Sequence, residues 1–212
     1  MRFEVSVSTT IDFKYVILSS GSNRTSEYQI KPNKQEADFV MISPRRNEHQ
    51  YSVSYQEGKL YIQTNRKHIN MELMEAEIDK PQEEFWKSVL PANPDALLSG
   101  VRVFKNYIAV QELGNAQNNV KIINRETKET HEVKLGKKDF GNVSISSNPN
   151  ANTDTIRLSY NSFNNLSTIY DYDMASEKSK AVWTDSLRVR YNPRWEIERI
   201  WATAPDGKKV PV

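Results

Sequence analysis

The chain has 212 residues, and its 29 lysines and arginines nearly balance its 27 aspartates and glutamates, which leaves a net charge of +2. This balance argues against nucleic acid or an anionic membrane as a partner. The absence of cysteine excludes a disulfide framework, a thiolate metal site and a cysteine nucleophile. The first residues alternate like a strand, and no apolar run is long enough to span a membrane. We therefore expect a cytoplasmic protein.

One hydrophobic pattern occurs four times along the chain. Its most apolar run begins at Lys14, Lys59, Asn106 and Asp154, so successive copies start 45, 47 and 48 residues apart. One strand-like run precedes each copy, at residues 3–8, 50–55, 99–104 and 142–147, and two such runs follow it. Four strands per unit with this period are typical of β-propeller blades. We predict an all-β protein, a partial β-propeller of about four four-stranded antiparallel blades, at residues 1–48, 49–96, 97–140 and 141–184.

Local sequence features support these strands. Every second residue in 5–9 and 51–55 is apolar or large, as in half-buried antiparallel strands. Polar breaks at 56–58, 124–128 and 173–177 suit the turns between strands. Only residues 81–86 suggest a helix, and they are long enough for one turn.

The last part of the sequence departs from the repeat. Asn192 and Pro193 disfavour regular structure, so residues 185–195 are predicted to form a linker. Residues 196–212 have the pattern of a strand, an Asp206-Gly207 turn and the start of another strand. Such a hairpin needs a sheet to join, so we expect the chain to stop just inside a second domain.

Candidate catalytic and metal-binding groups are few. The seven glycines form no Gly-x-Ser-x-Gly elbow, P-loop or dinucleotide fingerprint. His49, His68 and His131 are far apart in sequence, and we interpret them as surface or structural residues. Alternation places Asp171 and Asp173 on one face of a strand, which would suit a cation or an acid–base pair. The residues that follow lack the glycine and glutamate of a calcium loop, which favours a strand-end turn.

Two further groups have simple interpretations. The four tryptophans would suit a carbohydrate or base-stacking platform, but their places near strand ends and boundaries favour packing; they are Trp86, Trp183, Trp195 and Trp201. The acidic residues Glu72, Glu75 and Glu77 are expected to be solvated. No catalytic, cofactor-binding or metal-ligating residue is assigned.

Longer strings carry a family resemblance. Residues 167–178 (STIYDYDMASEK) and 196–212 (EIERIWATAPDGKKVPV) resemble the junction between propeller and peptidase domain in oligopeptidase B (protease II) members of the prolyl oligopeptidase family of serine peptidases. Residues 60–65, 85–95 and 147–163 resemble further propeller segments of that family, in the same order. The chain departs from the family at residues 194–197, where RWEI replaces a longer segment, and at Pro205, where the family has arginine.

The resemblance implies a fragment of a serine oligopeptidase that cleaves short peptides after arginine or lysine. It would comprise the last four of seven blades and the first residues of the peptidase domain, with the catalytic triad outside the chain. The propeller of such an enzyme admits short peptides and excludes folded proteins. The resemblance also implies a hinge and interdomain contact at Asn192, Pro193, Glu198, Arg199 and Trp201. No cofactor and no metal are expected.

Two alternatives from other classes remain. The chain could be a free-standing half-propeller without enzymatic activity, binding a protein partner through exposed blade edges. It could also be a carbohydrate-active propeller enzyme, which needs two carboxylates on the first strands of its blades. Those strands supply only Glu4, which weighs against the carbohydrate enzyme. We also expect self-association through the outer faces of the first and last blades, because a four-blade fragment leaves both uncovered.

Overall fold

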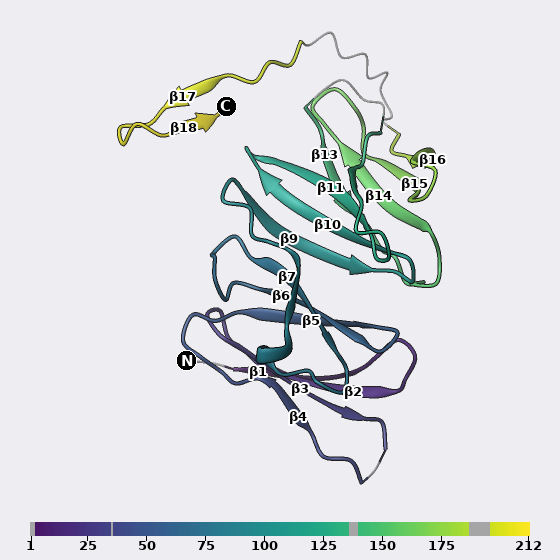
Figure 1. Ribbon diagram of the computed structural model, residues 1–212. Coiled ribbons are helices and arrows are strands. Elements are labelled where there is room, and N and C mark those ends of the chain that lie inside the picture. The colour runs from purple at the N-terminus through teal and green to yellow at the C-terminus, as the bar shows by residue number, and fades with distance from the viewer. Residues whose placement is uncertain (1–2, 35, 136–139, 187–195) are drawn as a thin grey trace. The chain divides into compact units, whose positions relative to one another are not determined.

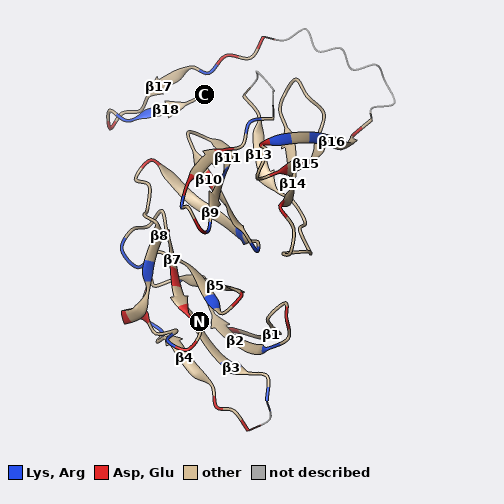
Figure 2. Cartoon of the chain, turned by 45° about the vertical axis from the view of Figure 1, so that its right-hand side comes forward, with Lys and Arg blue, Asp and Glu red and all other residues tan. Residues whose placement is uncertain are grey.

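The structure is a computed structural model that describes residues 3–34, 36–135, 140–186 and 196–212. Figure 1 shows successive antiparallel sheets followed by a short hairpin. The chain divides into two compact units, Met1–Leu98 and Ser99–Val212. Over the described ranges, no helix is both long and apolar enough to cross a membrane. Positively and negatively charged residues are interspersed along the strands and loops (Figure 2).

The first unit contains two four-stranded meanders. The first sheet has the order β1 (Glu4–Thr9), β2 (Tyr15–Gly21), β3 (Ser26–Pro32) and β4 (Val40–Ser43). The second has the order β5 (Tyr51–Gln56), β6 (Lys59–Thr64), β7 (Glu72–Glu77) and β8 (Lys87–Leu90). A 3-10 helix, η1 (Glu83–Phe85), precedes β8 where the sequence predicted one helical turn.

Two more meanders and the hairpin follow. The third sheet contains β9 (Ala96–Val103), β10 (Tyr107–Gly114), β11 (Gln117–Asn124) and β12 (Thr130–Glu132). The fourth contains β13 (Asn142–Ile145), β14 (Thr155–Asn161), β15 (Thr168–Asp173) and β16 (Lys178–Thr184). The hairpin pairs β17 (Trp201–Thr203) with β18 (Lys209–Pro211). Each strand run expected from the repeat overlaps a strand of the structure. The predicted all-β class and the four strands in each copy of the repeat are therefore confirmed.

Two-residue turns close two of the hairpins. Glu57 and Gly58 join β5 to β6 with φ angles of 47° and 81°. Asn115 and Ala116 join β10 to β11 with φ angles of 51° and 58°. Left-handed backbone at both central positions matches the twist of the flanking strands, and glycine and asparagine adopt it at least cost.

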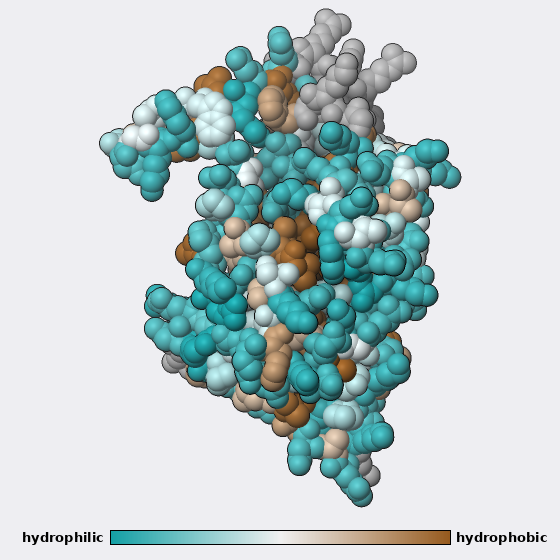
Figure 3. Space-filling view, viewed as in Figure 1, coloured by the Kyte–Doolittle hydropathy of each residue, from teal (hydrophilic) through white to brown (hydrophobic). Residues whose placement is uncertain are grey.

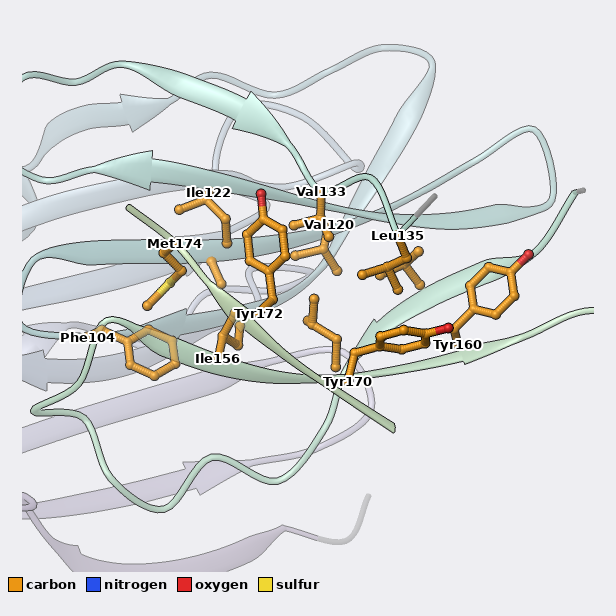
Figure 4. Packing of buried hydrophobic residues seen from close by; sticks show 13 residues of the cluster. Phe104, Val120, Ile122, Val133, Leu135, Ile156, Tyr160, Tyr170, Tyr172 and Met174 are labelled. Carbon is orange, nitrogen blue, oxygen red and sulfur yellow. The ribbon is translucent and has the colours of Figure 1, made fainter. Parts of the chain in front are cut away.

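Each unit has its own hydrophobic core. In the first unit, apolar side chains of both sheets form one cluster; its members are Ile17, Ile30, Ile42, Tyr51, Leu60, Ile62, Met74, Ala76 and Trp86. In the second unit, the core contains residues of the third and fourth sheets, and Figure 4 shows Ile122, Val133, Ile156 and Tyr172 packed within it. Burial of one face of each sheet explains the alternation seen in the sequence.

The prediction that β1 is half buried is wrong. Val5 and Val7 expose 68% and 64% of their surface, and every residue of β1 is exposed. The register pairs Val7 with Leu18 and Ser8 with Ile17, so the valines lie on the face opposite the buried Ile17. Alternation had identified two faces of the strand, but burial also requires an element that covers one of them.

Tyr51 links the first sheet to the second. Its hydroxyl donates to the carbonyl of Ser43 at 2.6 Å and accepts the backbone N–H of Tyr28 at 2.8 Å. Its own backbone N–H donates to Ser26 Oγ at 2.6 Å, and that hydroxyl donates to the Tyr51 carbonyl at 2.8 Å. Burial raises the pKa of Tyr51 to about 12, so the hydroxyl remains a neutral donor.

Replacing Tyr51 by phenylalanine tests this link. Tyr51→Phe keeps the ring but leaves the Ser43 carbonyl and the Tyr28 N–H without their partner. We therefore expect the free energy of unfolding to decrease by about 1–3 kcal/mol. Urea denaturation measures the difference. Tyr15→Phe is the matched control, because the Tyr15 hydroxyl makes no hydrogen bond within the described ranges. Equal stability of Tyr51→Phe and the unmodified chain would contradict the assignment.

Candidate functional site

The strongest functional candidate in the sequence was the junction at the C-terminal end. Of the predicted hinge and contact residues, Asn192 and Pro193 lie outside the described residues. Glu198 and Trp201 are exposed, whereas Arg199 is partly buried. Arg199 is therefore the predicted contact residue for which the structure supplies partners.

Arg199 attaches the C-terminal segment to the third and fourth sheets. Its Nη2 donates a hydrogen bond to Gln117 Oε1 at 2.9 Å. The guanidinium lies 4.7 Å from the centroid of the Phe140 ring. Gln117 Nε2 donates in turn to the carbonyl of Gly141 at 2.5 Å. A planar guanidinium can stack on a ring and donate to an amide at the same time, and we name Arg199, Gln117 and Phe140 the tail clamp.

One face of the hairpin beyond the clamp is apolar. The backbone groups of Ile200 and Val212 exchange hydrogen bonds of 3.1 and 2.9 Å, and Ala202 pairs with Val210. Period-two alternation puts these four residues on one face. Ile200, Val210 and Val212 are all exposed, and Figure 3 shows apolar side chains among the hydrophilic ones of this segment. An isolated two-stranded hairpin is marginally stable, so this face suits a partner element.

Removing the clamp should loosen the hairpin. In Arg199→Ala, we expect the backbone amides of Ile200 and Val212 to exchange with solvent roughly three- to tenfold faster, because one charge-assisted hydrogen bond and one ring contact are lost. Hydrogen exchange read by NMR measures the effect. Glu198→Ala serves as the control, since Glu198 is exposed and makes no hydrogen bond or ion pair among the described residues. Unchanged exchange in Arg199→Ala would refute the clamp.

The two aspartates of β15 serve local structure. Asp171 accepts hydrogen bonds of 2.8 and 3.0 Å from Arg157 Nε and Nη2, and they hold the pKa of its carboxyl below the usual 3.8. Asp173 accepts from the backbone N–H and the hydroxyl of Ser176, at 2.7 and 2.8 Å. The strand-end turn favoured by the sequence is therefore confirmed at Asp173. No group of three or more His, Asp or Glu side chains that would hold a metal occurs in the described ranges.

The tryptophans and glutamates differ in part from expectation. The indole N–H of the buried Trp86 donates to the Pro81 carbonyl at 2.9 Å, as packing requires. Trp183 and Trp201 are about half exposed, since they lie on an edge strand and in the hairpin, and Trp195 lies outside the described residues. Glu72 is buried and lies 3.7 Å from Arg66, so its predicted solvation is wrong. The charge of a nearby guanidinium compensates its burial.

A polar cluster around His49 escaped sequence reasoning. His49 is 5% exposed, and its ring stacks on Tyr51 with 5.1 Å between centroids. His49 Nδ1 lies 2.9 Å from Arg46 Nη2 and Nε2 lies 3.0 Å from Thr64 Oγ1. Because arginine only donates, Nδ1 must accept, and the neutral ring then carries its proton on Nε2. Arg46 lies in the β4–β5 connection and Thr64 ends β6, so no local motif joins the cluster.

Glu83 balances the positive charge of this cluster. Its carboxylate accepts from Arg46 at 2.7 Å and from the Ser43 hydroxyl at 2.8 Å, and Arg66 lies 3.6 Å away. These contacts tie the β4–β5 connection to η1 and to the β6–β7 connection. Thr64 is fully buried, so the Thr64–His49 pair has no access to a substrate and stabilises the fold. The remaining histidines lie elsewhere: His68 Nδ1 accepts the Asn70 N–H, and His131 lies 3.9 Å from Glu177.

His49 should make folding stability depend on pH. Burial lowers its pKa below 6.5, with a further decrease from Arg46 and Arg66 and an opposing increase from Glu83. The unfolded chain then binds the proton more readily than the folded chain. The contribution of the neutral His49 to folding stability is therefore fully present above about pH 6.5 and decreases as the pH falls below that value. Urea denaturation at pH 7.5 and 5.5 measures this difference. We expect His49→Gln to reduce the difference in stability between the two pH values and His68→Gln to leave that difference unchanged. An unchanged difference in His49→Gln would contradict the assignment.

Comparison with protein families identifies a propeller. The family model described as "Prolyl oligopeptidase, N-terminal beta-propeller domain" matches residues 1–185. The chain is 24% identical over 212 residues to a dipeptidyl aminopeptidase BI of Pseudoxanthomonas mexicana, and it spans 29% of that protein. It is 24% identical over 209 residues to a prolyl endopeptidase of Elizabethkingia miricola, of which it spans 28%. The chain thus covers less than a third of either relative.

Solved structures show the same fold. Oligopeptidase B from Leishmania major superposes with a TM-score of 0.85 at 19% identity, over 99% of this chain and 31% of that one. Oligopeptidase B from Trypanosoma brucei with covalently bound antipain gives a TM-score of 0.82 at 22% identity, with 99% and 31% coverage. The four meanders therefore have the arrangement of strands found within the blades of these propellers.

Proposed function

Because the chain belongs to the family of prolyl oligopeptidase N-terminal β-propeller domains, we propose that it forms part of the gating propeller of a serine oligopeptidase. In this role the propeller caps an active site, admits short unstructured peptides and excludes folded proteins. Its contribution is steric and electrostatic, and the chemistry belongs to a peptidase domain of the intact protein. Residues 196–212 would be the first part of that domain and residues 185–195 the hinge.

The observation that carries this proposal is the exposed apolar face of the hairpin. The family match ends at residue 185, and the hairpin follows it. Ile200, Val210 and Val212 expose apolar surface, as expected of a segment that another element covers. A peptidase domain would cover this face and extend the two strands into a sheet, while the tail clamp would hold the junction against the propeller.

The finer parts of the proposal rest on the sequence resemblance. The names of the relatives describe different activities, namely dipeptidyl aminopeptidase, prolyl endopeptidase and oligopeptidase B, so the names alone do not select a substrate. Cleavage after arginine or lysine is proposed because residues 167–178 and 196–212 resemble oligopeptidase B. A cytoplasmic location is proposed on the same resemblance and on the cysteine-free sequence. Exposed Val5, Val7 and Val182 on edge strands support self-association of the isolated chain.

A free-standing half-propeller that binds a protein partner is the second candidate. The exposed strands β1 and β16 favour it, because the outer edge of each is unpaired within the described sheets. The coding DNA beyond the Val212 codon separates the two candidates. An open frame that encodes an elbow serine supports the peptidase, whereas an immediate stop codon without such a domain nearby supports the binding module.

The isolated chain should not hydrolyse peptides. The sequence has no serine elbow, and a site without nucleophile, base and oxyanion hole retains almost no rate enhancement. We expect no turnover above buffer with fluorogenic peptides that carry arginine, lysine or proline at the scissile position. A known oligopeptidase B shows that the substrates and a serine-directed inhibitor work under these conditions, and a mock purification without the chain is the control for contaminating peptidase. Turnover above the mock purification that this inhibitor abolishes would refute the proposal.

A further inference from the structure

Strands β1 and β16 are exposed along their whole length, and each is the terminal strand of its sheet. Each pairs with one neighbouring strand, so its outer edge has no partner among the described sheets. Such an edge presents a row of backbone donors and acceptors to which another strand can pair. The two edges differ in the features that prevent this pairing in natural sheets.

The edge of β16 is protected, whereas that of β1 is not. Lysines and bulges both discourage pairing at a sheet edge. β16 carries Lys178 and Lys180, and its register with β15 shifts between Ile169 and Tyr170. β1 contains neither a lysine nor a proline, and its register with β2 is regular over the whole strand. The first sheet therefore has the less protected edge.

The hydrogen-bond pattern of β1 shows which backbone groups face this edge. The Thr10 N–H donates to the Tyr15 carbonyl at 2.9 Å, which continues the antiparallel ladder between β1 and β2. In such a ladder, every second residue of a strand bonds to the same neighbour. Counting back from Thr10, Ser6 bonds to β2, and the N–H and C=O groups of Val5 and Val7 point to the open edge.

The side chains of the same two valines are also uncovered. Val5 and Val7 expose 68% and 64% of their surface, on the face of the sheet opposite the core. Leu18, which pairs with Val7, is only partly buried on that face. Open backbone groups and exposed apolar side chains thus occur at the same residues of one edge.

From this geometry we propose that two copies of the chain pair through their β1 strands, antiparallel and about a two-fold axis at Ser6. The backbone of Val5 then exchanges hydrogen bonds with the partner's Val7, and by symmetry Val7 bonds to the partner's Val5. Two four-stranded sheets thereby join into one of eight strands. This pairing belongs to the 212-residue chain itself, independently of the peptidase role, and it narrows the expected self-association to one edge.

The sequence of β1 is self-complementary about Ser6. The valines of both copies lie in one row on the same face, where cross-strand pairs of β-branched residues are favourable. Glu4 lies opposite the partner's Ser8, so the two Glu4 carboxylates are four residues apart along the strands, or about 13 Å. This separation exceeds the screening length of about 10 Å at 0.1 M salt, so their repulsion is small.

Pairing at this edge closes on itself. The opposite terminal strand of the sheet is β4, which ends in the buried residues Ile42 and Ser43. The Ser43 carbonyl already accepts the Tyr51 hydroxyl. A third copy therefore has no comparable edge in this sheet, and an isologous contact about a two-fold axis gives a dimer, not a fibre.

Sedimentation velocity of the full chain tests the pairing. From low to high micromolar concentration, we expect the 24.5 kDa monomer to be replaced by a dimer. Val7→Lys places a charge at the centre of the edge and should weaken the dimer at least about tenfold. Val182→Lys on β16 is the matched control, because Val182 is also an exposed valine on an edge strand, and it should leave the affinity unchanged. Unchanged circular dichroism and unfolding midpoints show that both variants are folded.

Cysteine cross-linking tests the register, since the chain contains no cysteine of its own. An axis at Ser6 makes the two copies of this residue a non-hydrogen-bonded pair with Cα atoms about 4.5 Å apart, within the range of a disulfide. Oxidised glutathione should therefore link Ser6→Cys into a covalent dimer, with two glutathione thiols released per bond. Ser8→Cys is the control, because its two thiols would be separated by about 13 Å. We expect it to cross-link at least about tenfold more slowly.

Three results would each overturn the pairing. They are a monomer at every concentration, equal weakening by Val7→Lys and Val182→Lys, and equal cross-linking of Ser6→Cys and Ser8→Cys. None of them bears on the peptidase role, which the downstream coding sequence decides. An open frame with an elbow serine together with a monomeric chain would reject the dimer and leave the proposed function intact.

Discussion

Packing of one sheet face against the next sheet is the interaction on which both units depend. A four-stranded meander satisfies its inner backbone groups alone, but it buries apolar surface only when a second layer covers it. Ile17 and Ile30 meet Leu60 and Ile62 in the first unit, and Ile122 meets Ile156 in the second. The same constraint explains why β1 and β16 are exposed, because no described element covers them.

Polar contacts decide how closely the sheets of the first unit approach. Where Ser26, Tyr28 and Tyr51 meet, hydrogen bonds join the sheets beside the apolar core, to which the Tyr51 ring belongs. Farther along the same face, Ser6, Ser19 and Gly21 line a groove of about 800 Å³ between the two sheets. Apolar packing, a hydrogen-bonded link and an open polar space therefore follow one another along one inter-sheet surface. Part of the space between the two sheets therefore stays open to solvent.

Strand order and turn positions were predictable from the sequence, because both depend on neighbours close along the chain. Alternation, the Glu57-Gly58 turn and the repeat period are all local signals. The exposure of Val5 and the burial of Glu72 were not predictable, since each depends on residues from another strand or loop. The groove was missed for the same reason: Ser6, Ser19 and Tyr28 form one row only when the register is known. Arg199 was found through resemblance, but Gln117 lies 82 positions away and no local pattern connects them.

The pairing of every strand with its sequence neighbour has a consequence for synthesis of the chain. Each sheet can complete its hydrogen bonds as soon as its own four strands have emerged from the ribosome, because no strand waits for a distant partner. Apolar residues such as Ile17 and Ile30 then stay uncovered until the following sheet arrives. Tyr51 belongs to the first strand of that sheet, and it bonds back to Tyr28 and Ser43. Once Tyr51 has been synthesised, the first sheet can therefore begin to pack against the second.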